Sequence, residues 1–218
     1  MAQQLIVEGK DAIVLANILQ KRKMNPPKGY DNAQKFKTFV INAGGFSKVA
    51  TALKLALKNP ANKNIGIIVD CDQSGAADRF KQLINLVRKW KDVEISADVQ
   101  LSDEGFSMQF SEDLTIGIWI MPDNRSFGYL EHFLEKLIDE KDEIWQFTKE
   151  KIAELLQQDF NKLTEIKKQK ALIHTWLAWQ KDPGHPMGLA VQANYFNAKS
   201  PNADAFVNWF ENTFELAD

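Results

Sequence analysis

The segment 66-GIIVDCDQSG-75 decides how the rest of the chain is interpreted, because an apolar run ends in two aspartates. The apolar residues up to Val69 are typical of a buried strand in a parallel sheet. Residues two apart in a strand share a face, so we expect Asp70 and Asp72 to project together while Cys71 points away. Two close carboxylates repel each other unless a cation or a shared proton lies between them. The segment therefore predicts a carboxylate site at the end of a strand.

Strands and helices alternate on both sides of this segment. The spacing of apolar residues changes repeatedly between a strand period and a helix period, and breaker-rich turns such as NPPKGYDN (25–32) separate the elements. Such alternation is typical of a parallel sheet covered by helices. The expected strands are 4–7, 36–43, 65–70 and 115–121, the expected helices are 11–23, 46–58 and 76–91, and an irregular or hairpin insertion is expected at 98–110.

After Pro122 the pattern changes to helices without strands. No low-complexity linker separates this part from the sheet. We therefore expect an α/β core at 1–130 and a helical C-terminal extension at 131–218 that packs on it as one compact unit. The expected helices of the extension are 130–138, 143–160, 165–179, 188–195 and 203–214.

The composition is that of an ordinary globular protein, with 44% apolar and 26% charged residues in a chain of 218. The single cysteine excludes an internal disulfide bond and suits a reducing compartment. The N-terminal stretch MAQQLIVEGK lacks the basic and apolar regions of a signal peptide, and no apolar run reaches the roughly 20 residues that span a bilayer. We expect a soluble cytoplasmic protein with no membrane partner.

The net charge of −2 conceals a strong asymmetry along the chain. Residues 1–70 carry 11 Lys and Arg against 4 Asp and Glu, whereas residues 92–165 carry 6 against 18. A basic segment can bind the phosphates of a nucleic acid, but it can also simply cover a solvated helix face. The dense basic stretch at Lys21, Arg22 and Lys23 is our candidate contact with nucleic acid.

Acidic residues follow several of the expected strands. They are Glu8 after the first strand, Asp70 and Asp72 after the third, Asp123 after the last, and Glu131 at the start of the next helix. Ligands of open parallel sheets bind beyond the carboxyl ends of the strands, where these residues could converge. Each acid also has a structural explanation as a strand-end, capping, turn or first-turn residue. Their position at one edge of the sheet is what favours a shared site.

Two of these segments resemble the Toprim (topoisomerase–primase) domain: IVEGKD (6–11) after the first strand and IIVDCD (67–72) after the third. The sequence is most similar to a group of uncharacterised bacterial Toprim proteins related to the overcoming-lysogenization-defect nucleases. The Toprim resemblance covers residues 3 to about 130 and implies a Toprim-like parallel-type sheet flanked by helices. The likeness to the group extends over WIMPDN (119–124), LEHFL (130–134) and HTWLAWQKDPGHPMG (174–188).

The resemblance implies a role for each acid. Asp70 and Asp72 would bind Mg²⁺ or Mn²⁺, and Glu8 would act as the general acid/base or as a further metal ligand. Magnesium prefers hard oxygen ligands and keeps several waters, so one or two carboxylates and a substrate phosphate suffice. The possible accessory residues are Glu131, Asp123, Asp11 and Lys170.

One departure from the family pattern leaves two function classes open. Many relatives carry a second acid four residues after the glutamate, where this chain has Ala12 with Asp11 beside it. Successive helical residues point about 100° apart, so Asp11 is a poor replacement. The first class is a magnesium-dependent, nuclease-like enzyme acting on phosphodiester bonds of nucleic acid, in bacterial defence or repair. The second is a catalytically weakened Toprim module that binds nucleic acid or a protein partner such as an ATPase.

A further alternative concerns the segment DCDQS (70–74), which is similar to the nucleophile loop of haloacid-dehalogenase-type phosphatases. That loop normally follows the first strand of its sheet. Here a strand–helix–strand–helix run precedes the segment, so we do not favour the phosphatase interpretation.

Overall fold

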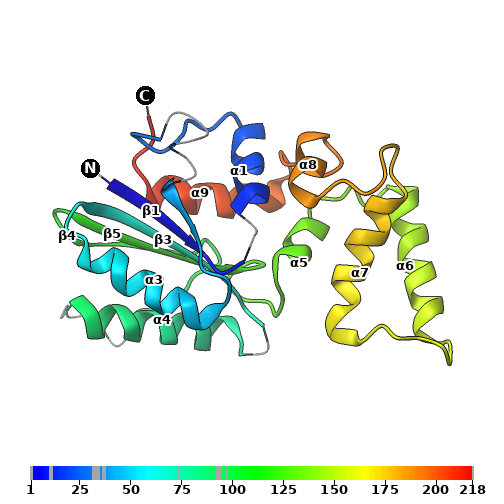
Figure 1. The fold of residues 1–218 in the computed structure, drawn as a ribbon, viewed down its shortest axis with the longest axis horizontal. Helices are drawn as coiled ribbons and strands as arrows, with labels where there is room; N and C mark the ends of the chain where they lie inside the picture. The colour runs from blue at the N-terminus through cyan, green and yellow to red at the C-terminus, as the bar shows by residue number, and fades with distance from the viewer. Residues whose placement is uncertain are drawn as a thin grey trace.

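The strands form a mostly parallel sheet in a computed structural model that describes residues 2–9, 12–30, 35, 38–72, 74–91, 95–96 and 98–217. Within these residues the sheet has five strands in the order β2-β1-β3-β5-β4 (Figure 1). The parallel strands are β1 (Ala2–Val7), β2 (Val40–Asn42), β3 (Asn62–Asp70) and β5 (Leu114–Met121). The edge strand β4 (Phe106–Ser111) pairs antiparallel with β5. The expected α/β class with a parallel-type sheet is confirmed.

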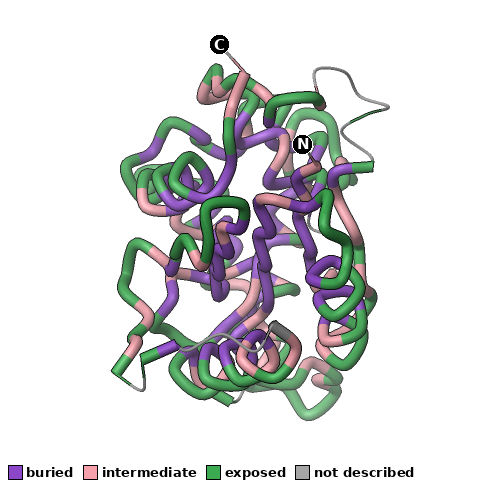
Figure 2. The backbone as a smooth tube through the Cα atoms, turned by 90° about the vertical axis from the view of Figure 1, so that its left-hand side faces the viewer, coloured by how far each residue is buried: buried purple, intermediate pink, exposed green. Residues whose placement is uncertain are grey.

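Helices cover both faces of this sheet (Figure 1). The helices α3 (Phe46–Lys58) and α4 (Ala76–Lys91) pack on one face, and α1 (Ala12–Lys21) and α9 (Asp204–Thr213) pack on the other. Alternation along β3 explains the two layers, because Ile67 and Val69 join the α3–α4 core while Ile68 joins the core on the opposite face. Figure 2 shows the central strands buried between exposed helix surfaces.

The segment between β5 and α9 forms a helical group beyond the carboxyl ends of the strands (Figure 1). It contains α5 (Leu130–Glu135), α6 (Glu143–Leu156), α7 (Glu165–Ala178) and α8 (Met187–Gln192). The helices α6 and α7 lie side by side and are joined by the edge-on packing of Trp145 on Trp176, whose ring centroids are 6.2 Å apart. None of the described helices combines the length and apolar composition needed to cross a membrane.

The C-terminal helix returns to the middle of the sheet. Gly66 and Gly117 are paired neighbours on β3 and β5. A Cβ at Gly66 would lie within 2.8 Å of the Phe214 ring, and one at Gly117 would lie within 2.9 Å of Thr213 Cβ. The two glycines therefore leave a strip without side chains, along which the end of α9 approaches the central strands. The extension thus supplies one of the layers that cover the sheet.

Local patterns misplace the start of β2, and they extend α5, α6 and α8 beyond their observed ends. The strand expected at 36–43 begins only at Val40, because residues 38 and 39 are helical. Phe39 is fully buried and packs edge-on against Phe214, at 5.0 Å between ring centroids. The helix expected to reach Phe160 ends at Leu156, and the Phe160 side chain is 72% exposed.

Candidate carboxylate site at the strand ends

Glu8 lies directly after β1, at the carboxyl end of the sheet, where β1 is paired with β3. Its Oε2 atom accepts a hydrogen bond from the backbone amide of Asp70 at 3.1 Å. Burial raises the pKa of the Glu8 carboxyl, and the negative charge of Asp72 also raises it. The backbone hydrogen bonds from Asp70 and Phe46 and the charge of Arg79 act in the opposite direction. A carboxyl group with a raised pKa is suited to hold or transfer a proton.

The turn after β2 fixes the backbone of Glu8. The Glu8 carbonyl accepts hydrogen bonds from the amides of Gly44 at 2.8 Å and Gly45 at 3.0 Å. These glycines have φ values of 78° and 127°, which residues with a Cβ rarely adopt. The turn places the first residue of α3, Phe46, beside the Glu8 carboxylate. The Gly44–Gly45 pair therefore positions the site, a role that its sequence does not reveal.

Asp70 and Asp72 lie at the same edge but do not share a strand face. The strand β3 ends at Asp70, and Asp72 has a φ of 50°, so the expected alternation does not reach Asp72. The carbonyl of Gly128 accepts hydrogen bonds from the amides of Cys71 at 3.1 Å and Asp72 at 3.3 Å. The Asp72 side chain is 49% exposed, and its Oδ2 pairs with Arg79 at 2.8 Å.

Arg79 is a site residue that the sequence reasoning missed. It stands in the first turn of α4, and its Cζ lies 3.9 Å from the centroid of the Phe46 ring. The side chain is only 11% exposed. The available signal was its place in the helix that starts directly after the Asp70–Asp72 pair.

Glu131 and Lys170 are brought together by α5 and α7. The Glu131 side chain is only 9% exposed, and Lys170 Nζ lies 3.9 Å from its Oε1. The Tyr129 hydroxyl donates a hydrogen bond to the Ile166 carbonyl at 2.6 Å. Burial raises the pKa of Tyr129, and the charges of Glu131 and Asp70 raise it further. Because the negative charges of both acids act on the Tyr129 hydroxyl, Glu131 lies at the same end of the sheet as Asp70.

Of the two remaining accessory acids, only Asp123 is described, and its partners lie within its own turn and on Lys136. Asp123 accepts hydrogen bonds from the backbone amide of Ser126 at 2.7 Å and from its hydroxyl at 2.9 Å, and it forms an ion pair with Lys136. Burial acts to raise the pKa of Asp123, but these hydrogen bonds outweigh it and lower the pKa. Asp123 therefore stabilises its own turn. Asp11 lies outside the described residues.

The basic stretch at the end of α1 contacts the C-terminal part of the chain. Lys21 Nζ donates to Asn194 Oδ1 at 2.7 Å, whereas Lys23 is exposed. Because ten helical residues span about 15 Å, α1 carries this stretch well away from Glu8. Arg22 donates hydrogen bonds to the carbonyls of Ala198 at 2.6 Å and Ser200 at 2.5 Å. It also forms an ion pair with Asp204 at 2.7 Å.

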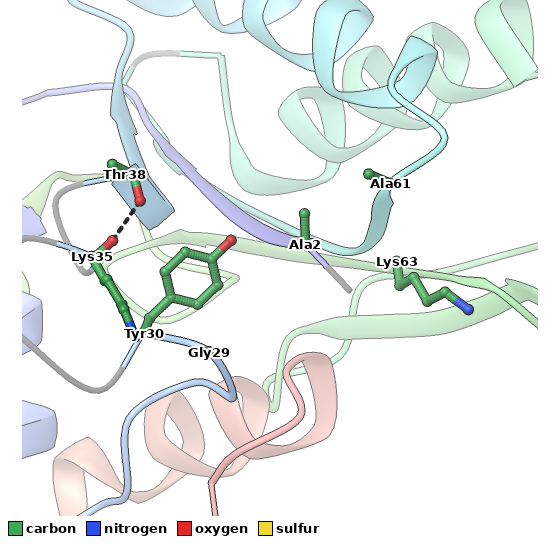
Figure 3. Close-up of a pocket in the computed structure, with 7 residues that line it drawn as sticks. All are labelled: Ala2, Gly29, Tyr30, Lys35, Thr38, Ala61 and Lys63. Atoms are coloured by element: carbon green, nitrogen blue, oxygen red, sulfur yellow. Dashed lines mark hydrogen bonds between the residues drawn. The ribbon is translucent and has the colours of Figure 1, made fainter.

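A separate hollow of about 520 Å³ lies at the amino ends of β1 and β3 (Figure 3). The Tyr30 ring projects into this region, and its hydroxyl donates to the Gln3 carbonyl at 2.9 Å. The hollow is at the opposite edge of the sheet from the carboxylates, so it is not part of the candidate site. Its lining residues are Ala2, Gly29, Tyr30, Lys35, Thr38, Ala61 and Lys63.

The carboxylates suit a hydrated cation better than a closed metal cluster. Among the described residues, no three His, Cys, Asp or Glu side chains form a group able to hold a metal ion. Magnesium, however, is usually bound by one or two carboxylates and several waters. Asp70 and Asp72 carry hard oxygen atoms of this kind at the carboxyl end of the sheet, and the Asp72 side chain is 49% exposed. Glu8, held by backbone amides, is better placed to handle a proton than to complete a ligand cluster.

Comparison with known proteins supports a family but no activity. The family model described as "Protein of unknown function (DUF3226)" matches residues 2–215. No curated protein and no solved structure matches the chain. Because the match spans nearly the whole sequence, the chain belongs to the DUF3226 family.

Proposed function

We propose that this protein carries out Mg²⁺- or Mn²⁺-dependent, Toprim-type phosphodiester chemistry on nucleic acid, as a nuclease-like enzyme of bacterial defence or repair. The observation that supports the proposal most directly is the 3.1 Å hydrogen bond from the Asp70 amide to Glu8 Oε2. It fixes a carboxyl group of raised pKa next to the aspartates at the ligand-binding edge of a parallel sheet.

The residues divide the work by their surroundings. Asp70 and Asp72 would hold the cation, which would supply a Lewis acid to polarise a phosphoryl oxygen. Glu8 accepts a proton from the attacking water or returns one to the leaving oxygen, since its raised pKa suits transfer in either direction. Lys170, 59% exposed beside Glu131, offers a positive charge to the substrate phosphate.

A second candidate function is a catalytically weakened module that binds nucleic acid or a protein partner such as an ATPase. Ala12, at the position where relatives carry a second acid, is 6% exposed and belongs to the apolar core between α1 and the sheet. Asp72 is in addition already paired with Arg79. Both observations favour a site with fewer available carboxylates than a two-metal nuclease uses.

A cleavage assay tests the enzymatic proposal. Wild-type protein, Glu8→Gln and the exposed control Glu104→Gln are incubated with Mg²⁺ or Mn²⁺ and single- and double-stranded DNA and RNA. Loss of a general acid/base costs about 10²–10⁴-fold in rate, so Glu8→Gln should lose cleavage while Glu104→Gln retains it. Cleavage that survives in Glu8→Gln would reject the assigned role.

Thermal unfolding tests the metal site without requiring activity. A cation at about 100 times its Kd stabilises the fold by about 2.7 kcal/mol, which for a chain of this size raises Tm by about 5–11 °C. The rise should vanish in Asp70→Asn/Asp72→Asn. If adding metal raised the Tm of that variant as much as that of wild type, the metal would bind at a site other than Asp70 and Asp72. Wild type that binds metal but cleaves no substrate would favour the weakened module.

A further inference from the structure

The guanidinium of Arg79 lies close to the carboxylates of Asp72 and Glu8 and carries the opposite charge. Its Nη2 atom lies 2.8 Å from Asp72 Oδ2, and its charge also lowers the pKa of Glu8. The charge of Asp72 raises the pKa of Glu8, so the two carboxylates repel each other, and the positive charge of Arg79 offsets that repulsion. Arg79 therefore already performs the electrostatic role that a bound divalent ion would perform.

The fold holds Arg79 in this place at a cost. The guanidinium stacks on Phe46, and the buried Nε atom has no hydrogen-bond partner. Leaving a buried charged donor unpaired is unfavourable, so the ion pair and the stacking must offset that cost. Phe46 also opens α3 and donates its amide to Glu8. Arg79, Phe46 and Glu8 are thus one connected unit.

We propose that Arg79 is the built-in counter-ion of this edge and that a divalent cation binds Asp72 only by displacing it. The inference rests on the proposed metal site. An arginine bonded to Asp72 Oδ2 and a cation that needs the same carboxylate compete for it. Arg79 therefore acts as a positioning residue: it keeps the metal-free edge ordered and lowers the affinity for metal.

Calorimetric titration with Mn²⁺ tests the competition. An ion pair of a half-exposed carboxylate changes an equilibrium constant by about fivefold, so Arg79→Gln should bind Mn²⁺ about fivefold more tightly than wild type. Arg79→Lys keeps the charge and should remain near wild type. Arg125→Gln is the matched control, since it removes an arginine paired with Asp103 at 2.6 Å. It should stay within about twofold.

Two results would overturn the displacement. The first is an Arg79→Gln protein that binds Mn²⁺ no more tightly than wild type. The second is equal tightening in Arg125→Gln, which would indicate a general effect of net charge. A simple loss of structure cannot mimic the expected result, because a damaged site binds metal more weakly.

A metal-free double-mutant cycle separates this inference from the proposed function. Thermal unfolding of wild type, Arg79→Gln, Asp72→Asn and the double variant measures the coupling between the two residues. A counter-ion role predicts that Arg79→Gln lowers Tm and that adding Asp72→Asn restores part of the loss. Strictly additive changes would overturn that role. If wild type fails to bind Mn²⁺, the metal site and the displacement fall together, whereas the metal-free coupling still decides whether Arg79 is the counter-ion.

Discussion

Replacing Arg22 with Gln separates a structural arginine from one that binds nucleic acid. Arg22 lies in the densest basic stretch of the sequence, which made it a candidate phosphate contact. In the fold its side chain is only 18% exposed and donates to the carbonyls of Ala198 and Ser200 at 2.6 and 2.5 Å. It thereby fastens the end of α1 to the segment that precedes α9. We expect Arg22→Gln to destabilise the protein and to leave nucleic-acid affinity unchanged.

The size of the effect follows from those contacts. Asp204 is 53% exposed, so its ion pair with Arg22 contributes little. Because both hydrogen bonds from the guanidinium are only partly buried, each is assigned about 1–1.5 kcal/mol, the upper part of the range for an ordinary intramolecular hydrogen bond. Arg22→Gln should therefore lower the free energy of unfolding by about 2–3 kcal/mol. For a chain of this length that corresponds to a fall in Tm of about 4–12 °C.

The assay pairs thermal unfolding with a salt titration of labelled oligonucleotides in the absence of metal. Lys23→Gln is the matched control, because it removes the same charge from an exposed position in the same stretch. A phosphate contact would flatten the log–log salt dependence by about 0.7–0.9. If Arg22→Gln flattened that slope and left Tm within 1 °C or so of the Lys23→Gln value, the structural assignment would be refuted.

The remaining predictions concern the first turn after β1. Glu8 has a raised pKa in the folded protein, so its contribution to stability is complete below the ordinary glutamate pKa of about 4.3 and is lost as pH rises through the folded value. Glu8→Gln should therefore raise Tm at neutral pH, with a gain that shrinks towards pH 4; a gain independent of pH between 4 and 8 would contradict this. Ala12→Asp should lower Tm and fail to raise any cleavage activity, because Ala12 is 6% exposed in the core; higher activity at unchanged Tm would show that position 12 faces the site.

The local spacing of apolar residues predicted correctly those helices whose first residues follow a glycine turn in the sequence. The helices at 46–58 and 76–91 have the expected bounds. Gly44–Gly45 precedes the first and Gly75 precedes the second, and each helix has an apolar face of regular spacing. The parallel pairing of β1, β2, β3 and β5 also followed the expectation for alternating strands and helices. These features depend on short-range spacing, which a single sequence displays.

Features set by distant packing were not predictable in this way. Phe39 falls within an apolar run that resembles a strand, but its burial against Phe214 places it in a helical turn before β2. Trp176 and Trp179 are three residues apart on or next to α7, yet Trp176 is buried whereas Trp179 is 41% exposed and packs on Phe147. Both outcomes depend on residues far away in the sequence.

The same distinction applies to the candidate site. The rule for parallel sheets places Glu8 and Asp70 at one edge, and the structure brings them into contact there. The partners that determine their chemistry could not be inferred, because Phe46, Arg79 and Tyr129 meet the acids only through the packing of α3, α4 and α5. The sequence thus indicates the acids and their edge, but not the charges that balance them.

Charged side chains that are buried at a cost in stability indicate the location of the site independently of any resemblance to a known family. Glu8 is partly buried with a raised pKa, Glu131 is buried with one lysine nitrogen at 3.9 Å, and Arg79 buries an unpartnered Nε. Charged groups in such surroundings reduce stability unless they are well paired. All three lie at the carboxyl end of the sheet. In the part of the chain that the structure describes, the other buried side-chain polar atoms without partners are uncharged: Trp119 Nε1, whose ring packs on Trp209 of α9, and Thr213 Oγ1 at the end of α9.

The grouping of these three charged side chains is informative. Proteins generally avoid burying charged groups that lack good partners, and the exceptions are often found at functional sites. A sheet edge kept only for stability would be better served by neutral residues at Glu8 and Glu131, which need no counter-ion. Two acids, the partly buried Glu8 and the buried Glu131, are instead retained there together with an arginine held between Phe46 and Asp72. The proposed exchange of the internal cation for an external one would use this arrangement. The buried and partly buried charges, rather than the depth of any hollow, are therefore our reason for placing the proposed ligand site at this end of the sheet.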